Sequence, residues 1–369
     1  MNKARLRKTF MELVQIDSVS GHEGQLQRYL KQAFAELDFE VQEDDAMNDT
    51  GFGANNLICT LEANAPYQHA MLFTSHMDTV QPGQNVKPII QDGYIYSEGE
   101  TILGADDKAG IAVLLETFKT IQEDALPHGK IQILLTIGEE SGLLGIKALD
   151  PDMIKSDMGF TLDATKPVGE TVIGGPARTH FKVAIIAPPG KAQLSATQIA
   201  SRVIQQLELG TIDEQTKVTL MKMGGEPFAK SDAVRLEFEL KSFSNETIRQ
   251  VARTMKQTIE ETTSMLNAKA LMEIIELYPA FKVQEDTNVV TIAEESAKRI
   301  GLEPETSTVL SGSDGTILNQ YGLETVILGV GFEDIHTTSE RIAIQSLEDL
   351  TRQTLEIIAL GLFKESELI

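Results

Sequence analysis

Residues 103–140 read LGADDKAGIAVLLETFKTIQEDALPHGKIQILLTIGEE and contain a helix followed by a strand. Apolar residues recur at helical spacing over about 108–121, and the run at 131–137 is almost wholly apolar, as in a buried strand. One acidic pair precedes the helix and another follows the strand. A helix that leads directly into a buried strand is the repeating unit of an α/β fold.

Strand-like and helical segments alternate on both sides of this stretch. Further strands are predicted at 56–61, 70–75 and 158–162, and late in the chain the alternation returns with a helix at 286–300, a strand at 324–330 and a helix at 346–363. Alternation of this kind requires crossover connections between strands. We therefore predict an α/β protein with a mixed, mostly parallel sheet flanked by helices.

The pattern changes between residues 176 and 278. Strands predicted at 179–187, 216–223, 233–243 and 268–277 alternate polar and apolar residues, and helices are predicted at 192–207 and 245–266. Amphipathic strands beside two helices are typical of a small α+β domain with one open sheet face. The prediction is thus one domain formed by 1–175 and 279–369, with a second domain, 176–278, inserted into it.

Composition excludes several classes of partner. The 369 residues include 32 Lys and Arg against 55 Asp and Glu, a formal net charge of −23, which argues against nucleic acid or an anionic membrane as a partner. The single cysteine, Cys59, excludes an internal disulfide and a CxxC pair. No apolar run approaches the roughly 18 residues of a membrane span, and the basic N-terminus lacks the apolar stretch of a signal peptide. We expect a soluble, cytoplasmic protein.

Residues able to bind a metal follow several predicted strands or precede a helix. They are His76, Asp78, Asp106, Asp107, Glu139, Glu140, Asp163 and His336. In open α/β sheets, ligands bind at the carboxyl ends of the strands, where these residues would meet. Imidazoles and carboxylates without a thiol suit zinc, cobalt or manganese. One such residue alone would more often be a helix cap or a solvent-facing carboxylate, but coincidence at several strand ends favours a metal centre.

Spacing along the chain indicates different roles for these residues. His76 and Asp78 are two residues apart and point the same way in extended chain, so Asp78 could accept the second ring N–H of His76 and fix its tautomer. Glu139 and Glu140 are adjacent and point in different directions, so one can bind metal while the other takes a proton from a metal-bound water. Asp107, at the start of a helix, is placed to bridge two metals.

A second candidate site lies at 311–315, which reads SGSDG and precedes a short helix. The amides at Gly312, Ser313 and Asp314 could cradle a substrate carboxylate, and an ordinary flexible turn is an equally good interpretation. The remaining histidines are interpreted as capping, solvated or packing residues. They are His22, His69, His128 and His180.

Six strings together resemble the dinuclear zinc exopeptidases: SHMDTV, LGADDKAG, TIGEESGLLGIK, TLDA, YPAFKVQED and LGVGFEDIHTTSERI. The resemblance spans nearly the whole chain and is closest to the peptidase T-like tripeptidases of that superfamily, which also contains glutamate carboxypeptidases and aminoacylases. It implies a zinc exopeptidase-like α/β catalytic domain and an inserted domain that serves as a lid and dimer interface. A homodimer is therefore expected.

The resemblance also implies a ligand set for two zinc ions. His76 and Asp163 would hold one ion, Glu140 and His336 the other, and Asp107 would bridge them. A cis peptide bond would join Asp106 to Asp107. Glu139 would be the general base that activates the bridging water and then protonates the leaving amine, while Asp78 would orient His76.

Three parts of the inserted domain depart from the family pattern. The stretch 187–195 contains no histidine where relatives carry an Ala-His-Ala-Gly loop, 224–230 lacks a Gly-Gly-Thr-x-x-Asn loop, and Lys241 stands where relatives place Arg. The leading prediction is a zinc-dependent aminopeptidase of the tripeptidase type, acting on short peptides with a free N-terminus. The alternatives are a related amidohydrolase, of aminoacylase or carboxypeptidase type, and a catalytically impaired relative that binds peptides.

Overall fold

The computed structural model describes residues 1–188, 194–225 and 232–363, and the chain divides into two compact units. The first unit comprises Met1–Gly174, Lys282–Thr308 and Ser313–Ile369; the second comprises Gly175–Phe281 and Val309–Gly312. The inserted unit thus ends at Phe281 rather than at 278. It also includes Val309–Gly312, which the sequence analysis had placed in the larger domain.

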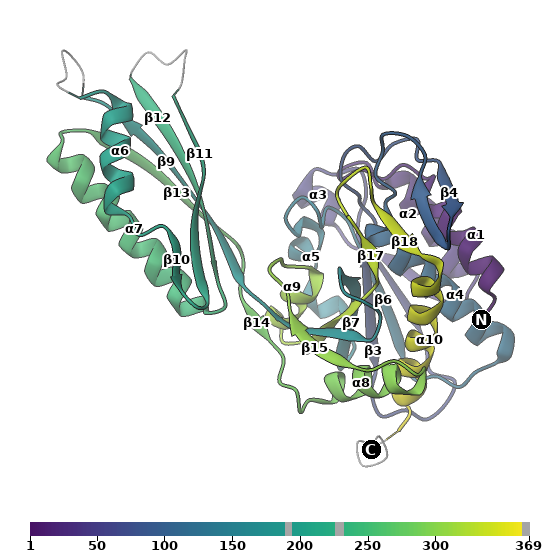
Figure 1. The fold of residues 1–369 in the computed structure, drawn as a ribbon. Coiled ribbons are helices and arrows are strands. Elements are labelled where there is room, and N and C mark those ends of the chain that lie inside the picture. Colours follow the sequence, from purple (N-terminus) through teal and green to yellow (C-terminus); the bar gives the residue numbers. More distant parts are fainter. Residues whose placement is uncertain (189–193, 226–231, 364–369) are drawn as a thin grey trace. The chain divides into compact units, whose positions relative to one another are not determined.

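The first unit is built on a nine-stranded sheet with the order β1-β2-β6-β3-β7-β16-β8-β14, with β15 paired to β8 (Figure 1). Its strands are β1 (Glu40–Glu43), β2 (Leu57–Leu61), β3 (Met71–His76), β6 (Ile131–Thr136), β7 (Met158–Ala164), β8 (Glu170–Gly175), β14 (Phe281–Lys282), β15 (Glu305–Thr308) and β16 (Thr325–Gly329). Strands β6, β3, β7 and β16 run parallel to one another, whereas β1 and β2 are antiparallel additions. The predicted mixed, mostly parallel sheet is confirmed.

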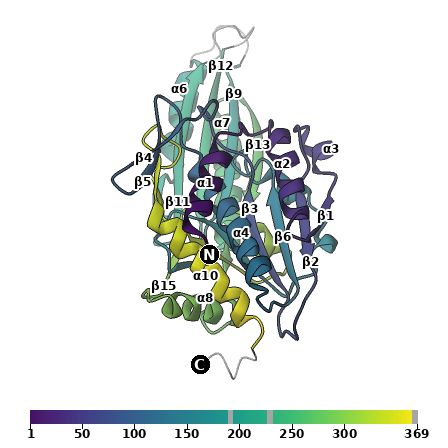
Figure 2. The same cartoon turned by 90° about the vertical axis from the view of Figure 1, so that its right-hand side faces the viewer.

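Helices cover both faces of this sheet. They are α1 (Lys3–Val14), α2 (Gly24–Ala35), α3 (Ala46–Thr50), α4 (Ala105–Asp124), α5 (Leu144–Ala148), α8 (Asn288–Arg299), α9 (Asp314–Gln320) and α10 (Ile344–Leu360), with a short 3-10 turn at Pro151–Met153. Helix α4 packs against β3 and β7 with α1 and α10 beside it, while α9 packs against β3, β7 and β16 from the opposite face (Figures 1 and 2).

Helix α4 is buried along most of its length because it lies between the sheet and two other helices. Its central run, Ile111–Leu115, is buried on every side, as expected for a helix without a polar face. The first turn is irregular, since Asp106 and Asp107 have non-helical backbone angles. The predicted helix over 108–121 therefore corresponds to the regular part of α4, which begins after Asp106 and Asp107.

A second, antiparallel sheet of four strands completes the first unit, in the order β17-β18-β5-β4. These strands are β4 (Pro88–Gln91), β5 (Tyr94–Ser97), β17 (Phe332–Glu333) and β18 (Arg341–Ala343). The turn between β17 and β18 carries His336. Segments from the first and last thirds of the sequence are thereby joined through the pairing of β5 with β18.

The second unit is an antiparallel sheet with two helices, as predicted. The strand order is β10-β11-β12-β9-β13, with β9 (Ala177–Ile186), β10 (Gly210–Asp213), β11 (Thr216–Gly225), β12 (Ala233–Ser242) and β13 (Lys269–Tyr278). Helices α6 (Ala196–Gln206) and α7 (Asn245–Met265) pack on one face (Figures 1 and 2). Alternate residues of β9, such as Phe181 and Val183, are buried, because successive strand residues point to opposite faces.

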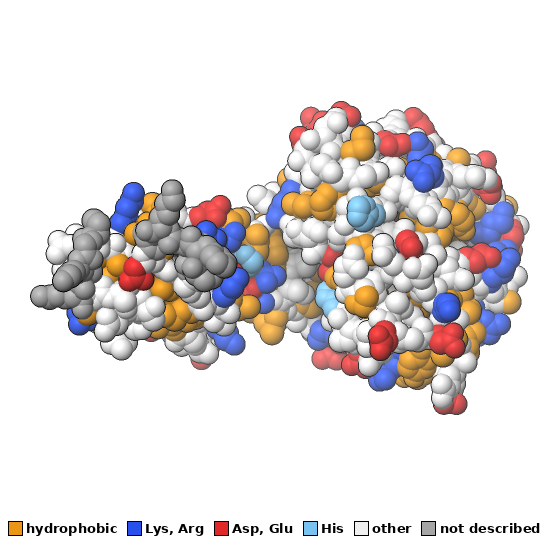
Figure 3. Space-filling view, turned by 90° about the horizontal axis from the view of Figure 1, so that it is seen from above, with side chains coloured by type: hydrophobic (Ala, Val, Ile, Leu, Met, Phe, Trp, Pro, Cys, Tyr) orange, Lys and Arg blue, Asp and Glu red, His pale blue; other side chains and the backbone are white. Residues whose placement is uncertain are grey.

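The surface carries charges of both signs. On the face shown in Figure 3, Lys and Arg side chains are interspersed with Asp and Glu and with hydrophobic side chains. Within the ranges that the structure describes, no helix has the length and apolar character needed to span a membrane.

Candidate active site

The predicted metal-binding residues are brought to one edge of the central sheet. His76 is the last residue of β3, Glu139 and Glu140 follow β6, and Asp163 lies near the end of β7. Strands β3, β6 and β7 are parallel neighbours, so their carboxyl ends meet at the same edge. The start of α4 and the turn after β17 supply the other members of the site.

Asp106 lies between two imidazoles that come from distant parts of the chain. Its Oδ1 is 3.1 Å from His76 Nε2 and its Oδ2 is 3.2 Å from His336 Nε2. The same His336 nitrogen is 2.7 Å from Glu140 Oε1. One carboxylate therefore faces both histidines, one oxygen to each, as a bridging ligand would.

Asp107, predicted as the bridging residue, has different contacts from Asp106. Its Oδ2 accepts a hydrogen bond from the Ser75 hydroxyl and its Oδ1 accepts one from Gly110 N at 3.2 Å. It faces His76 and Asp163, and ligand atoms of these three residues lie within 4.8 Å of one another. The peptide bond between Asp106 and Asp107 is cis, as the family resemblance implied. Of the two aspartates, Asp106 rather than Asp107 contacts both imidazoles.

Two groups of possible ligands result from this arrangement. His76, Asp106 and Glu140 form one, and His76, Asp107 and Asp163 form the other; in each, the ligand atoms lie within 4.8 Å of one another. His336 adds a second imidazole to the first group through its contacts with Asp106 and Glu140. Nitrogen and carboxylate oxygen are the donors that zinc, cobalt and manganese accept, so the residues fit a pair of divalent cations.

The protonation states of these groups also favour a cation. Burial, followed by the charge of Asp163, raises the pKa of Asp107 and of Glu139 well above the usual values. Burial raises the pKa of Asp163 to about 7. The hydrogen bonds from His336 to Asp106 and Glu140 raise the pKa of that imidazole to about 10. In the described part of the chain, the ion pairs of these buried carboxylates are with His76 and His336 and not with lysine or arginine. Such a cluster is costly, and divalent cations would neutralise it.

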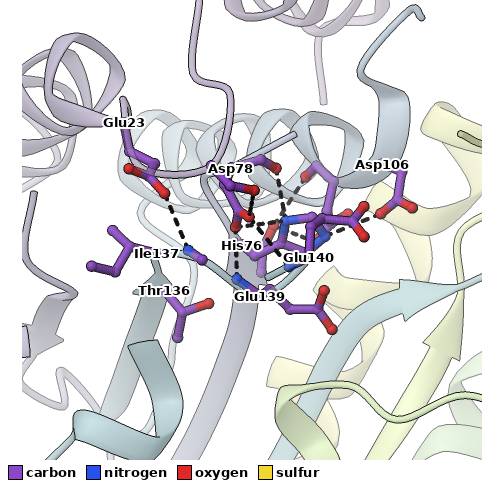
Figure 4. Close-up of polar contacts among 12 residues, drawn as sticks. Glu23, His76, Asp78, Asp106, Thr136, Ile137, Glu139 and Glu140 are labelled. Atoms are coloured by element: carbon purple, nitrogen blue, oxygen red, sulfur yellow. Dashed lines mark hydrogen bonds and ion pairs between the residues drawn. The ribbon is translucent and has the colours of Figure 1, made fainter. Parts of the chain in front are cut away.

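Asp78 holds the site through hydrogen bonds that involve main-chain groups, either its own or those of Glu139 and Glu140. His76 Nδ1 is 2.9 Å from the main-chain oxygen of Asp78 and 3.4 Å from its Oδ1. The first contact fixes the tautomer that leaves Nε2 facing Asp106. The Asp78 carboxylate is used differently: it accepts hydrogen bonds from Glu139 N at 2.9 Å and Glu140 N at 3.2 Å (Figure 4). Asp78 is thus a positioning residue for both sides of the site.

Glu139 differs from its neighbours because its carboxylate has no hydrogen bond to any part of the chain that the structure describes. Figure 4 shows its side chain extending away from Asp78 and Glu23. A side chain beside the ligand groups with both oxygens free can accept a proton from a reacting water. This is the behaviour expected of a general base.

Glu340, which no sequence motif singles out, is buried close to the site. Its carboxylate accepts backbone hydrogen bonds from Leu103 at 2.7 Å, Gly104 at 2.8 Å and Asp106 at 3.1 Å. These bonds hold the irregular chain that precedes α4 and so orient Asp106. The only sequence signal was an acidic residue soon after His336, which by itself is ordinary for a surface loop.

The predicted anion site at 312–314 is not supported, because its groups already have protein partners. Gly312 N donates to the Tyr278 hydroxyl at 2.9 Å within the second unit. Ser313 N donates to Thr316 Oγ1 at 3.2 Å within the first. The Asp314 carboxylate is buried and accepts a hydrogen bond from Thr136, and burial raises its pKa to about 6. A cradle for a carboxylate needs free amides, and two of the three are occupied.

The departures predicted in the inserted domain are only partly visible. Residues 189–193 of the stretch 187–195, and residues 226–230 of the stretch 224–230, lie outside the described residues. Lys241 is described: its ammonium group donates to Leu310 O at 3.2 Å and lies 3.5 Å from Glu239 Oε1.

Metal affinity is expected to rise with pH. A ligand must lose its proton to bind a cation, and the raised pKa of Asp163 (about 7) and of His336 (about 10) makes protons compete at higher pH than for the free residues. Raising the pH therefore strengthens binding. Competition with a chromogenic chelator at roughly pH 6, 7 and 8 should show affinity increasing at each step. An affinity that does not change with pH would contradict this assignment of ligands.

The chain is similar to known proteins along most of its length. Residues 72–359 match the model of peptidase family M20/M25/M40. The chain is 40% identical over 366 residues to the uncharacterised Bacillus subtilis protein YqjE, covering 97% of this chain and 98% of that one. It is 27% identical to peptidase T of Clostridium perfringens, covering 96% of this chain and 98% of that protein.

Solved structures give the same result. A tripeptidase from Staphylococcus aureus superposes with a TM-score of 0.94 at 44% identity, covering 98% of this chain and 99% of that one. An aminopeptidase from Bacillus cereus gives a TM-score of 0.92 at 39% identity, covering 97% and 98%. These matches confirm the resemblance seen in the sequence motifs. With its cluster of histidines and carboxylates at the carboxyl edge of a parallel sheet, the chain belongs to peptidase family M20/M25/M40.

Proposed function

We propose that the protein is a metal-dependent aminopeptidase that removes the N-terminal residue from short peptides, tripeptides above all. One observation carries the proposal: Asp106 lies between His76 and His336, with the free carboxylate of Glu139 beside the same groups. The similarity to a tripeptidase of Staphylococcus aureus and an aminopeptidase of Bacillus cereus supports the choice of substrate.

The proposed cofactors are two zinc ions, with cobalt or manganese as substitutes. His76 and Asp163 would hold one ion, and Glu140 and His336 the other. Asp106 would be shared between them, in place of Asp107. When bound, a pair of divalent cations supplies Lewis-acid chemistry, polarising the scissile carbonyl and making an attacking water more acidic.

The chain's own groups carry the proton transfers. Glu139 takes a proton from the attacking water and returns it to the nitrogen of the departing amine. Burial, and then the charge of Asp163, raises the pKa of Glu139, which makes its carboxylate a stronger proton acceptor. Asp78 keeps Glu139 in place through the backbone amide, and keeps the His76 ring oriented through its main-chain oxygen.

Cleavage of a small peptide panel tests the proposal. The zinc-reconstituted protein should release the N-terminal residue from a free tripeptide, and a chelator should abolish the release. The same tripeptide with an acetylated N-terminus is the matched control and should not be cleaved.

Two other outcomes would each contradict the proposal in a distinct way. Hydrolysis of N-acylated amino acids in preference to tripeptides would indicate an aminoacylase-like amidohydrolase. Binding of metal and peptide without any release would indicate a catalytically impaired peptide-binding relative.

We further propose that the protein is a cytoplasmic homodimer whose interface lies in the second unit. The family resemblance supports the dimer, and the single, buried cysteine, Cys59, is compatible with a reducing compartment. Light scattering on the purified protein measures the oligomeric state directly. A monomer at micromolar concentration would contradict the dimer but leave the proposed activity unaffected.

A further inference from the structure

The turn that carries Glu139 and Glu140 is held by two carboxylates from elsewhere in the chain. Its three successive backbone N–H groups all donate to side chains: Gly138 N to Glu23 Oε1 at 3.2 Å, Glu139 N to Asp78 Oδ1 at 2.9 Å, and Glu140 N to Asp78 Oδ2 at 3.2 Å (Figure 4). Neither helix nor sheet supplies these contacts. The direction of the Glu139 and Glu140 side chains therefore depends on both carboxylates.

The conformation of Gly138 makes the contact with Glu23 important. Gly138 has a φ of +57°, in the left-handed region, and a Cβ added there would lie 2.6 Å from a ring carbon of Phe52. Glycine is the residue that adopts this conformation without strain, but it is also the least restricted. Because glycine has no side chain to restrict its backbone, a hydrogen bond from the Gly138 N–H helps to hold this conformation.

Glu23 contacts the turn at Gly138 without capping the helix that follows it in the sequence. It precedes α2, yet its side chain makes no capping hydrogen bond to that helix. It is fully buried, its Oε1 accepts from Gly21 N at 3.0 Å and from Gly138 N, and its Oε2 has no partner among the described residues. Burial of a carboxyl group with one unpaired oxygen lowers the stability of the fold. The presence of Glu23 despite this cost indicates that it has a role other than stabilising the fold.

The segment before Glu23 is attached to the same site. Ser20 Oγ donates to Asp78 Oδ2 at 2.6 Å, and Ser20 N donates to Thr79 O at 3.1 Å. Glu23 and Asp78 are thereby fixed relative to each other. The two carboxylates that hold the turn are thus linked to each other through the segment from Ser20 to Glu23.

We propose that Glu23 is a positioning residue for the general base: by accepting the Gly138 N–H it sets the direction of Glu139 and Glu140. The proposal rests on the proposed function, since it assigns Glu139 a role in the reaction. Glu23 does not touch the ligand groups, so its effect passes through the turn. A displacement of about 1 Å in a reacting group can cost roughly 10²-fold in rate, which sets the scale of the effect.

Replacing Glu23 by Ala and by Gln tests the proposal. Glu23→Ala removes the acceptor and should lower kcat by roughly 10–100-fold with KM little changed. Glu23→Gln keeps a carbonyl oxygen in the position of Oε1 and should retain most of kcat. Burial raises the pKa of Glu23 to about 7, so the neutral form that Gln imitates is well populated in the native protein.

Glu116 provides the matched control. It is a buried carboxylate of the same unit, 2% exposed, and it too accepts a backbone hydrogen bond, from Asn2 N. Glu116→Ala should lower the melting temperature while leaving kcat unchanged. If Glu116→Ala and Glu23→Ala reduce kcat equally, or if folded Glu23→Ala keeps the wild-type kcat, the proposal is wrong.

A third variant covers the case in which Glu23→Ala does not fold. Glu23→Asp keeps the charge but shortens the side chain by one methylene, so it cannot reach Gly138 N in the same position. The expected order of kcat is wild type, then Gln, then Asp. The reverse order, with Asp above Gln, would show that charge rather than the acceptor position matters and would overturn the proposal.

Zinc affinity separates this proposal from the proposed function. Glu140 lies in the same turn, so Glu23→Ala should weaken binding of one of the two zinc ions by roughly 10-fold, whereas Glu23→Gln should not. If the wild type cleaves no peptide but the variants show this difference in affinity, the proposed function fails and the positioning role stands. Equal affinity in all variants, in a wild type that is active, would contradict the positioning role alone.

Discussion

Replacement of Glu139 by Gln is expected to reduce kcat by roughly 10²–10⁴-fold while the bound metal is retained. Gln has the same size as Glu but cannot take a proton from water, and the Glu139 side chain contributes no hydrogen bond that the described structure would lose. The backbone contact of residue 139 with Asp78 is independent of the side chain. Steady-state kinetics on a tripeptide together with metal analysis of the same sample gives both quantities.

Glu285→Gln is the control for this variant, because Glu285 is an exposed carboxylate of the same unit. It should leave both kcat and metal content unchanged. A Glu139→Gln protein with full activity would rule out Glu139 as the base. Loss of zinc in that variant would instead make Glu139 a ligand.

Replacement of Asp106 by Asn should lower the metal content of the protein and reduce kcat by more than roughly 10²-fold. The reason is geometric: the two oxygens of Asp106 face different imidazoles, so the change affects both halves of the site. Loss of a group that merely supports a ligand already costs roughly 10–100-fold, and a shared ligand should cost more.

The neighbouring substitution, Asp107→Asn, is the matched comparison. Asp107 accepts hydrogen bonds from Ser75 and Gly110, and an amide oxygen can replace at least one of these contacts. Its effect on zinc content should therefore be smaller than that of Asp106→Asn. Zinc content measured after gel filtration compares the two variants. If Asp107→Asn loses the metal and Asp106→Asn retains it, the assignment from the sequence is right and the one from the geometry is wrong.

The sequence was a good guide wherever one segment carried its own signal. The strands that lead to His76, Glu139 and Asp163 are largely apolar, and an acidic residue or histidine at or just after the end of such a run is conspicuous. The antiparallel unit was recognisable for the same reason, since alternation along β9 and β12 is a local property of each strand.

The sequence pattern of one segment does not predict features that depend on local backbone angles or on contacts between residues far apart in the chain. Asp106 and Asp107 are adjacent acidic residues, and which of them faces the imidazoles follows from non-helical backbone angles that composition does not reveal. Glu23 contacts Gly138 and Glu340 contacts Asp106, pairs that lie far apart in the sequence. Val309–Gly312 joins the second unit through Tyr278 and Lys241 for the same reason.

His336 and Glu340 lie far along the sequence from Asp106, which has a consequence for synthesis of the protein in the cell. A chain emerging from the ribosome exposes Asp106 and Glu139 long before the segment that supplies the second imidazole and the carboxylate that orients Asp106. A product of premature termination that stops before this segment retains most of the acidic residues but cannot form the complete centre. The complete centre can therefore form only after the segment that carries His336 and Glu340 has been synthesised.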